Sequence, residues 1–382
     1  MEINLRCYVE LQGERKETEV TLHQEEDGSL FCTLPMAQLT IKLKENVSIQ
    51  GVPEISPYVL RPATTVNILD DIKLSLLEGT NQLKVDFENL ELDAIYQIEG
   101  SDEVNFRFYL NNSPFFNSDY EPYNVNISGK PFSFRKDRQG GISPSIEVNN
   151  VQYSNLEEIE KIIDDICWLL SFAGGVYSSI ARVEAWHNNS IAYIKFNSCQ
   201  EINKLKSGLK IIDDTDVCKF IEKSYQPYQQ NKQNYLLNNL IEVGLRTENI
   251  IFLEVKPLLM ANFLEILRHN YVINIAIPGG YIEEKLDGLY WKPPHSNANN
   301  RAGFKTILDH FCTNIQISDW NNDFVDVRNE IVHTGKLSGD TFTRYRQLHQ
   351  FCNRVILALL DWDLVGGEYI RRGSLTKEAY SR

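Results

Sequence analysis

Three side chains that could act on a phosphodiester lie close together near the end of the chain: Arg328, Asn329 and His333. Cleavage of RNA without a metal requires that one proton leave the 2′-hydroxyl and that another reach the departing 5′-oxygen. A histidine titrates near neutral pH and can serve in either step. A guanidinium offers a permanent charge and a two-pronged donor to the oxygens of the phosphorane transition state. An asparagine amide can orient the imidazole or the phosphate without adding charge.

The segment around these residues has the spacing of a short amphipathic helix. At roughly 100° per residue, four apolar side chains form one stripe: Trp320, Phe324, Val327 and Ile331. Asn329 and His333 lie one turn apart on the polar side, whereas Arg328 lies roughly 140° from His333. Gly335 is a typical helix stop, so we expect His333 in the last turn. There the helix dipole favours a protonated imidazole, which suits an acid.

The spacing of arginine and histidine is not specific by itself. It occurs three times in the chain, at Arg182/His187, Arg328/His333 and Arg344/His349. The middle copy alone has an asparagine directly after the arginine, and it lies on a short predicted helix between two longer ones.

Each of these residues also has an ordinary structural interpretation. Arg328 would form a surface ion pair with one of three acidic neighbours, Asp323, Asp326 or Glu330. His333 would cap its helix, and His349 would lie on a solvated helix face.

The first 150 residues have the pattern of β-strands. Short runs that alternate apolar and polar residues are separated by clusters of glycine, proline, asparagine and aspartate. Many short strands of this kind predict an antiparallel, β-sandwich-like domain over residues 1–150. No catalytic spacing occurs in it, so we interpret it as a recognition or regulatory domain.

The hydrophobic period changes near residue 154. Apolar residues then recur at helical spacing, at Ile159, Ile162, Ile163, Ile166, Leu169 and Leu170. A β-like stretch over 176–196 follows, which makes residues 151–212 a mixed α/β connector. Residues 213–382 are mostly helical, with Pro257 in the middle or at the restart of a helix and with a loop over 277–300. The sequence therefore predicts an α+β fold in two parts, with a C-terminal helical bundle.

Composition limits the class of protein. The formal net charge is −14, and the first 150 residues hold 24 acidic against 13 basic side chains, so the acidic excess lies in the β part. That balance argues against a surface coated with basic residues. Seven scattered cysteines, without a Cys-x-x-Cys pair, and the absence of a secretory or spanning segment favour a cytoplasmic protein without membrane partners.

The run from Arg328 to His333 resembles the RNxxxH form of the HEPN domain motif. The layout resembles the Apea-like HEPN branch, in which the HEPN bundle follows a β-rich domain in bacterial defence proteins. The resemblance covers residues 210–365 and extends more loosely to the whole chain. It implies a helical bundle that forms a homodimer through its motif helices. It also implies a composite RNase site at the dimer axis, without metal or cofactor, which leaves 2′,3′-cyclic phosphate ends.

Further expectations follow from the same resemblance. Many HEPN members carry a polar or acidic residue on an earlier bundle helix, and Glu265 is the candidate here. Arg328 and His333 would be the central catalytic residues and Asn329 a supporting one, acting on RNA in defence or toxin-like growth arrest. The β domain would sense an unknown ligand or trigger.

Two other functions remain open from the sequence. In the first, the bundle is a non-catalytic HEPN-type module that binds a nucleotide or RNA or only dimerises, which the acidic net charge favours. In the second, the β domain binds a protein or a sugar and the bundle is an oligomerisation handle.

Overall fold

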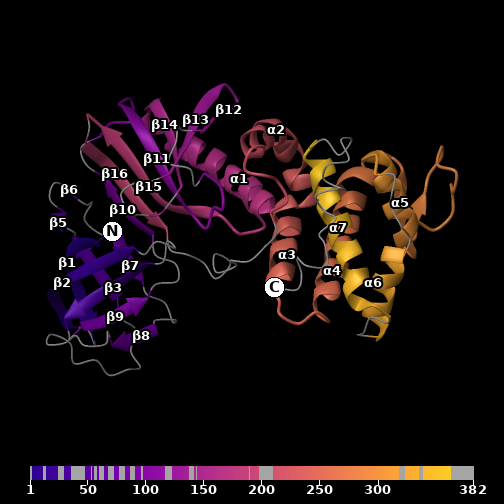
Figure 1. Ribbon diagram of the computed structural model, residues 1–382, viewed down its shortest axis with the longest axis horizontal. Coiled ribbons are helices and arrows are strands. Elements are labelled where there is room, and N and C mark those ends of the chain that lie inside the picture. Colours follow the sequence, from indigo (N-terminus) through magenta and orange to yellow (C-terminus); the bar gives the residue numbers. More distant parts are fainter. Residues whose placement is uncertain are drawn as a thin grey trace. The chain divides into compact units, whose positions relative to one another are not determined.

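The computed structural model describes residues 2–11, 14–24, 30–35, 48–52, 54–55, 58–59, 64–67, 73–76, 82–86, 91–95, 98–116, 123–136, 142, 144–188, 190–197, 210–317, 323–334 and 339–362. The chain divides into two compact units (Figure 1). Unit 1 comprises Met1–Leu170 and Tyr177–Lys206, and unit 2 comprises Ser171–Val176 and Ser207–Arg382.

The first sheet of unit 1 is built from N-terminal strands. It has seven antiparallel strands in the order β7-β4-β1-β2-β3-β9-β8. Their bounds are β1 Glu2–Leu11, β2 Glu14–Gln24, β3 Leu30–Pro35, β4 Ser48–Val52, β7 Thr64–Asn67, β8 Lys73–Leu76 and β9 Gln82–Asp86. The short strands β5 (Glu54–Ile55) and β6 (Tyr58–Val59) pair separately.

The second sheet of unit 1 draws on more distant segments. Its order is β10-β16-β15-β11-β14-β13-β12. Its strands are β10 Glu91–Ile95, β11 Glu103–Asn111, β12 Tyr123–Ile127, β13 Lys130–Arg135, β14 Ser145–Gln152, β15 Ser179–His187 and β16 Ser190–Asn197. The central strands β11 and β15 come from either side of the helix α1 (Leu156–Gly174), which a 3₁₀ turn, η2 (Tyr153–Asn155), precedes.

The two faces of the second sheet differ in chemistry because side chains alternate along each strand. Phe106 and Phe108 of β11 are opposite Ala185 and Val183 of β15, and all four are buried. The same strands place Arg107 opposite Glu184 on the other, polar face.

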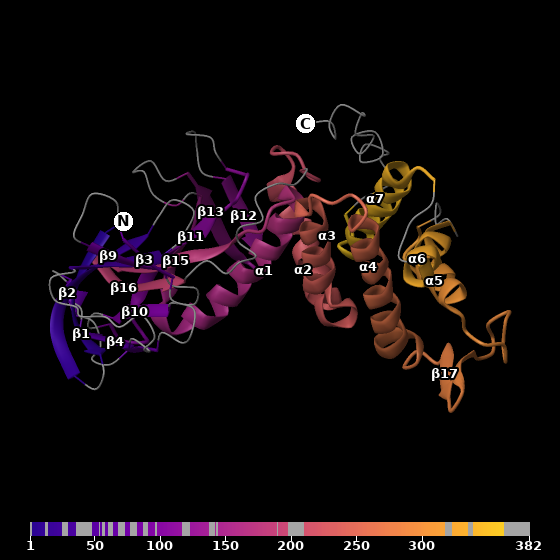
Figure 2. The same ribbon diagram turned by 90° about the horizontal axis from the view of Figure 1, so that it is seen from below.

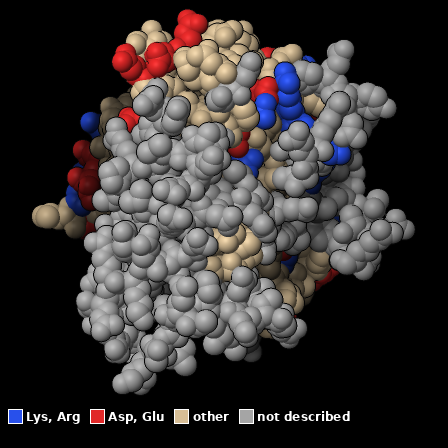
Figure 3. Space-filling view, turned by 90° about the vertical axis from the view of Figure 1, so that its left-hand side faces the viewer, with Lys and Arg blue, Asp and Glu red and all other residues tan. Residues whose placement is uncertain are grey.

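The helix α1 lies along this sheet (Figures 1 and 2). Glu158 and Glu160 of the helix form ion pairs with Lys130 of β13 and Lys195 of β16 at 2.6 and 2.9 Å. In Figure 3, among the described residues in view, acidic side chains gather at the top and basic ones at the upper right, and the two kinds lie side by side at the left edge.

Unit 2 is helical. Its elements are α2 Val217–Tyr235, α3 Leu237–Asn249, α4 Lys256–Tyr271, the π-helix η4 Val272–Ala276, the hairpin β17 Ile282–Lys285 and β18 Gly288–Trp291, α5 Phe304–Asn314, α6 Asp323–Thr334 and α7 Thr341–Leu359. The helix α4 contacts α2, α3, α5, α6 and α7, so it is the centre of this unit. No helix within the described ranges combines the length and the apolar character that a bilayer crossing needs.

The predicted α+β class, with an antiparallel β part followed by helices, is confirmed. The segment interpreted as a connector, residues 151–212, contributes α1, β15 and β16, most of which belong to unit 1. Pro257 lies in the first turn of α4 and therefore marks a restart rather than a kink. The predicted loop over 277–300 was wrong in part, because it contains the hairpin of β17 and β18.

Candidate functional site

The helix α6 forms where the amphipathic pattern predicts it. Phe324, Val327 and Ile331 are buried as the predicted apolar stripe, which turns the polar residues of the helix away from that core. The helix ends at Thr334, so His333 lies in its last turn, as expected, and its side chain is exposed. Trp320 and Gly335, the other residues of that prediction, lie outside the described residues.

Arg328 reaches from α6 to α4 and meets Glu265. Its Nε donates to Glu265 Oε1 at 2.7 Å, and its Nη2 contacts the same oxygen. Its Nη1 donates to Asn329 Oδ1 at 2.9 Å. The side chains of Arg328 and Glu265 are 21% and 30% exposed, so the pair lies at the edge of the bundle rather than inside it.

A second arginine shares the carboxylate. The Nε of Arg268 lies 3.5 Å from Glu265 Oε2, three residues further along α4. The ring of Phe304, at the start of α5, lies under both guanidinium groups, 4.9 Å from Arg328 Cζ and 5.4 Å from Arg268 Cζ. Two positive charges therefore surround one negative charge, which leaves the cluster with a net positive charge.

The structure brings together three of the four predicted site residues. Glu265, Arg328 and Asn329 form one cluster, whereas His333, among the described residues, makes no hydrogen bond or ion pair with any of these three and is exposed. The partner of Arg328 is Glu265, not one of the acidic neighbours considered from the sequence. Glu330 instead pairs with Arg344 of α7 at 2.8 Å.

Sequence reasoning missed Arg268 and Phe304. Neither residue belongs to a motif or a spacing that indicates a site in the sequence. Because their meeting depends on how α4, α5 and α6 pack, no spacing in the chain could have indicated it.

Comparison of the chain with protein-family models, with curated proteins and with solved structures gave no match.

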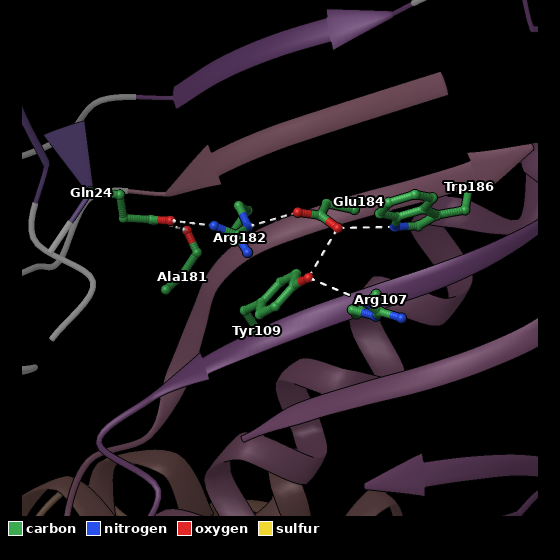
Figure 4. Close-up of polar contacts among 7 residues, drawn as sticks. All are labelled: Gln24, Arg107, Tyr109, Ala181, Arg182, Glu184 and Trp186. Atoms are coloured by element: carbon green, nitrogen blue, oxygen red, sulfur yellow. Dashed lines mark hydrogen bonds and ion pairs between the residues drawn. The ribbon is translucent and has the colours of Figure 1, made fainter. Parts of the chain in front are cut away.

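A second polar constellation lies in unit 1 and was not predicted (Figure 4). Arg182 and Glu184 of β15 form an ion pair at 3.0 Å, with side chains 8% and 4% exposed. Glu184 Oε2 also accepts hydrogen bonds from the Tyr109 hydroxyl at 3.0 Å and from Trp186 Nε1 at 2.9 Å. The Arg182 guanidinium lies 3.8 Å from the centre of the Tyr109 ring.

Further hydrogen bonds and ion pairs extend from both ends of the buried Arg182–Glu184 pair. At one end Arg182 Nη1 donates to Gln24 Oε1 of β2 at 3.3 Å, which links the two sheets of unit 1 (Figure 4). At the other end Arg107 connects Tyr109 to Glu147, and Arg135 binds the second oxygen of Glu147. We call this row the inter-sheet chain, formed by Gln24, Arg182, Glu184, Tyr109, Arg107, Glu147 and Arg135.

Electrostatics agree with this arrangement. Burial, with the charge of Glu184, raises the pKa of Tyr109, so the phenol keeps its proton and donates to the carboxylate. The pKa of Arg107 rises although burial acts to lower it, because the hydrogen bond to Tyr109 and the charge of Glu147 outweigh burial. Positive and negative side chains alternate along the inter-sheet chain, and both carboxylate oxygens of Glu184 are bonded. The inter-sheet chain therefore suits a structural role.

Proposed function

We propose that this protein is a metal-independent endoribonuclease of HEPN type. Arg328 would stabilise the charge of the transition state, His333 would transfer a proton, and Asn329 and Glu265 would hold Arg328 in place. The observation that carries the proposal is the Glu265–Arg328–Asn329 cluster, which joins the motif helix α6 to the central helix α4.

The cluster supports this chemistry through its charge and its exposure. Glu265 fixes the orientation of Arg328 while Arg268 restores the positive charge that Glu265 cancels. A guanidinium has five N–H donors, and the contacts described here use three of those on Arg328. Since its side chain is partly exposed, its other donors suit a phosphate oxygen.

His333 completes the site most simply if two copies of the chain pair through α6. On one helix Arg328 and His333 lie roughly 140° apart, which disfavours joint action on one phosphate. A twofold axis beside α6 would let His333 of one copy approach Arg328 of the other. The proposed active form is therefore a homodimer with RNA as substrate.

The decisive experiment measures RNA cleavage in EDTA by the purified chain and by two variants, Arg328→Ala and His333→Ala. We expect each variant to lose about 10²–10⁴-fold in rate, and products of the native chain to carry 2′,3′-cyclic phosphate ends. Matched controls are Arg246→Ala and His269→Ala, which change side chains on α3 and α4 outside the cluster. Cleavage that survives both site variants unchanged would show the assignment to be wrong.

Two observations favour a second function, a non-catalytic module that binds RNA or a nucleotide. Glu265 already binds Arg328, and the net charge of −14 disfavours tight binding of a polyanion. This function predicts saturable binding of an oligonucleotide or a nucleotide without turnover. Binding that Arg328→Ala weakens, with products absent after long incubation, would favour it over the nuclease.

The remaining parts of the proposal concern setting and control. We propose that the protein acts in the cytoplasm in bacterial defence or growth arrest, with unit 1 as the sensor that restrains the nuclease. Expression of residues 207–382 alone should then be more toxic to cells than expression of the whole chain. Equal toxicity at equal protein level would contradict restraint by unit 1.

A further inference from the structure

An insert of unit 2 packs back onto the bundle through aromatic and histidine side chains. The insert, residues 277–303, connects the π-helix η4 to α5 and projects as the hairpin of β17 and β18 (Figures 1 and 2). Trp291 at the end of β18 is buried, and its Nε1 lies 3.3 Å from Thr306 Oγ1 of α5. The ring of His295 stacks on Trp291 with centroids 3.9 Å apart and planes 7° apart.

His310 of α5 is the residue that the insert covers. Its ring lies 5.1 Å from Trp291, 5.5 Å from His295 and 5.0 Å from Tyr281. On its other side, Tyr271 at the end of α4 places its hydroxyl 2.5 Å from His310 Nδ1. The imidazole therefore joins α4, α5 and the insert.

Asn314 fixes the proton positions in the contact between Tyr271 and His310. Asn314 Nδ2 donates to the Tyr271 oxygen at 2.7 Å, so the hydroxyl proton is directed to His310 Nδ1. Burial raises the pKa of Tyr271, which keeps that hydroxyl protonated. His310 Nδ1 is thus an acceptor, and the ring is neutral with its proton on Nε2.

His295 also accepts a hydrogen bond through its Nδ1. Its Nδ1 lies 3.1 Å from the backbone nitrogen of Asn297, whose N–H it accepts. Protonation at Nδ1 of either histidine would replace an acceptor by a donor and break the bond that it now accepts. Two protonated rings 5.5 Å apart would also repel each other.

Among the described residues, the side chains in ring contact or hydrogen bonding with His310 carry no negative charge. The titratable groups whose rings face His310 are Tyr271 from α4 and Tyr281 and His295 from the insert. On its own helix, Asp309 is the adjacent residue. Burial lowers the pKa of His310, and the charge that His295 would carry when protonated lowers it further, so the neutral His310 ring is the stable form near pH 7.

We propose that the insert is an acid-released strap: neutral His295 and His310 hold it on α5, and their protonation releases it. The strap ends at Gly303, and Phe304, the ring under Arg328 and Arg268, follows directly. Trp291 is bonded to Thr306 in the same helical turn. Release of the insert therefore loosens the packing of Phe304 against Arg328. The effect of this release on RNA cleavage rests on the proposed nuclease function.

Hydrogen exchange tests the strap without any RNA. Two N–H groups report the closed form. The indole N–H of Trp291 donates to Thr306 Oγ1 of α5 and so reports contact between the insert and the bundle, and the backbone N–H of Asn297 donates to the His295 ring and so reports the state of that ring. After correction for intrinsic rates, their protection should fall at least about tenfold between pH 7.5 and pH 5. Equal protection at both pH values would overturn the proposal.

Matched variants identify the groups that titrate. The double variant His295→Asn plus His310→Asn replaces each Nδ1 by an amide oxygen, which still accepts and does not titrate. Its insert should stay protected at pH 5, whereas His269→Asn, on the exposed side of α4, should release like the native chain. Release of the double variant at pH 5 would overturn the assignment to these histidines.

A direct observation covers the case in which the double variant folds poorly. Nitrogen-15 spectra of histidine-labelled native protein at pH 7.5 should show His310 protonated at Nε2 and bare at Nδ1. The opposite tautomer would overturn the strap, while loss of RNA cleavage would leave it intact. Failure of the nuclease and failure of the strap are therefore separate results.

Discussion

The two arginine clusters of this protein use similar side chains in opposite ways. In the inter-sheet chain, Arg182 and Glu184 are almost fully buried and pair with each other, and tyrosine, tryptophan and glutamine add further hydrogen bonds. In the second cluster, which we call the α4–α6 cluster, Arg328 of α6 and Arg268 of α4 share the carboxylate of Glu265 at a partly exposed edge. Buried charges require complete pairing, whereas an exposed cluster can keep an excess of charge for a ligand. The second arrangement is the one suited to binding an anion.

The largest expected effect is the removal of a buried charge from the inter-sheet chain. Glu184→Ala leaves Arg182 uncompensated and removes the acceptor of Tyr109 and Trp186. We expect a loss of about 3–5 kcal/mol in the free energy of unfolding of unit 1, measured by urea titration with hydrogen exchange at β15. A loss of less than about 1 kcal/mol, as for an exposed ion pair, would show that the inter-sheet chain is not buried in solution.

The next effect concerns pH and the buried histidines of unit 2. His349, expected from the sequence on a solvated face, is buried, and it lies 3.1 Å from Glu248. Burial lowers its pKa in spite of Glu248, and Lys256 lowers it further; burial and His295 lower that of His310. The unfolded chain, with a pKa of about 6.5, then binds these protons first.

Stability should therefore be complete above about pH 6.5 and decrease as the pH falls below it, by up to about 1.4 kcal/mol per pH unit for each histidine. Urea midpoints between pH 5 and pH 7.5 measure this slope. The variant His349→Gln should flatten it, and a slope that His349→Gln leaves unchanged would contradict the role of His349.

A smaller stability effect is expected in the α4–α6 cluster, where activity changes far more. A double-mutant cycle with Glu265→Ala and Arg328→Ala should give a coupling of roughly 1 kcal/mol or less in the free energy of unfolding, because both groups are partly exposed. The same variants should reduce RNA cleavage by at least about 10²-fold. A coupling as large as that expected at Glu184 would remove the contrast between the two clusters.

The smallest effect lies at the exposed end of the inter-sheet chain. Arg135 is 49% exposed and bonds Glu147, which Arg107 also binds. Arg135→Ala should change the free energy of unfolding by less than about 1 kcal/mol in the same urea titration. A loss in the free energy of unfolding as large as that expected for Glu184→Ala would mean that the residues of the inter-sheet chain act as one cooperative network.

Local patterns predicted the elements better than the contacts between them. The apolar stripe of α6 and the last-turn position of His333 follow from helical spacing and are observed. The alternation of Arg182, Glu184 and Trp186 also follows from a strand, because residues two apart share a face. The alternation could not show that this polar face is buried, because burial depends on which other segments lie over the face.

The sequence by itself determined where most of the described helices and strands lie, the hairpin of β17 and β18 excepted, because the apolar periods of 3.6 and 2 residues are properties of neighbouring residues. It also singled out Arg328, Asn329 and His333 through their spacing. Only the tertiary structure decided that Glu265, Arg268 and Phe304 surround Arg328, and that the insert covers His310. The physical reason is that a contact between distant segments depends on how whole helices pack, which no short window of residues contains.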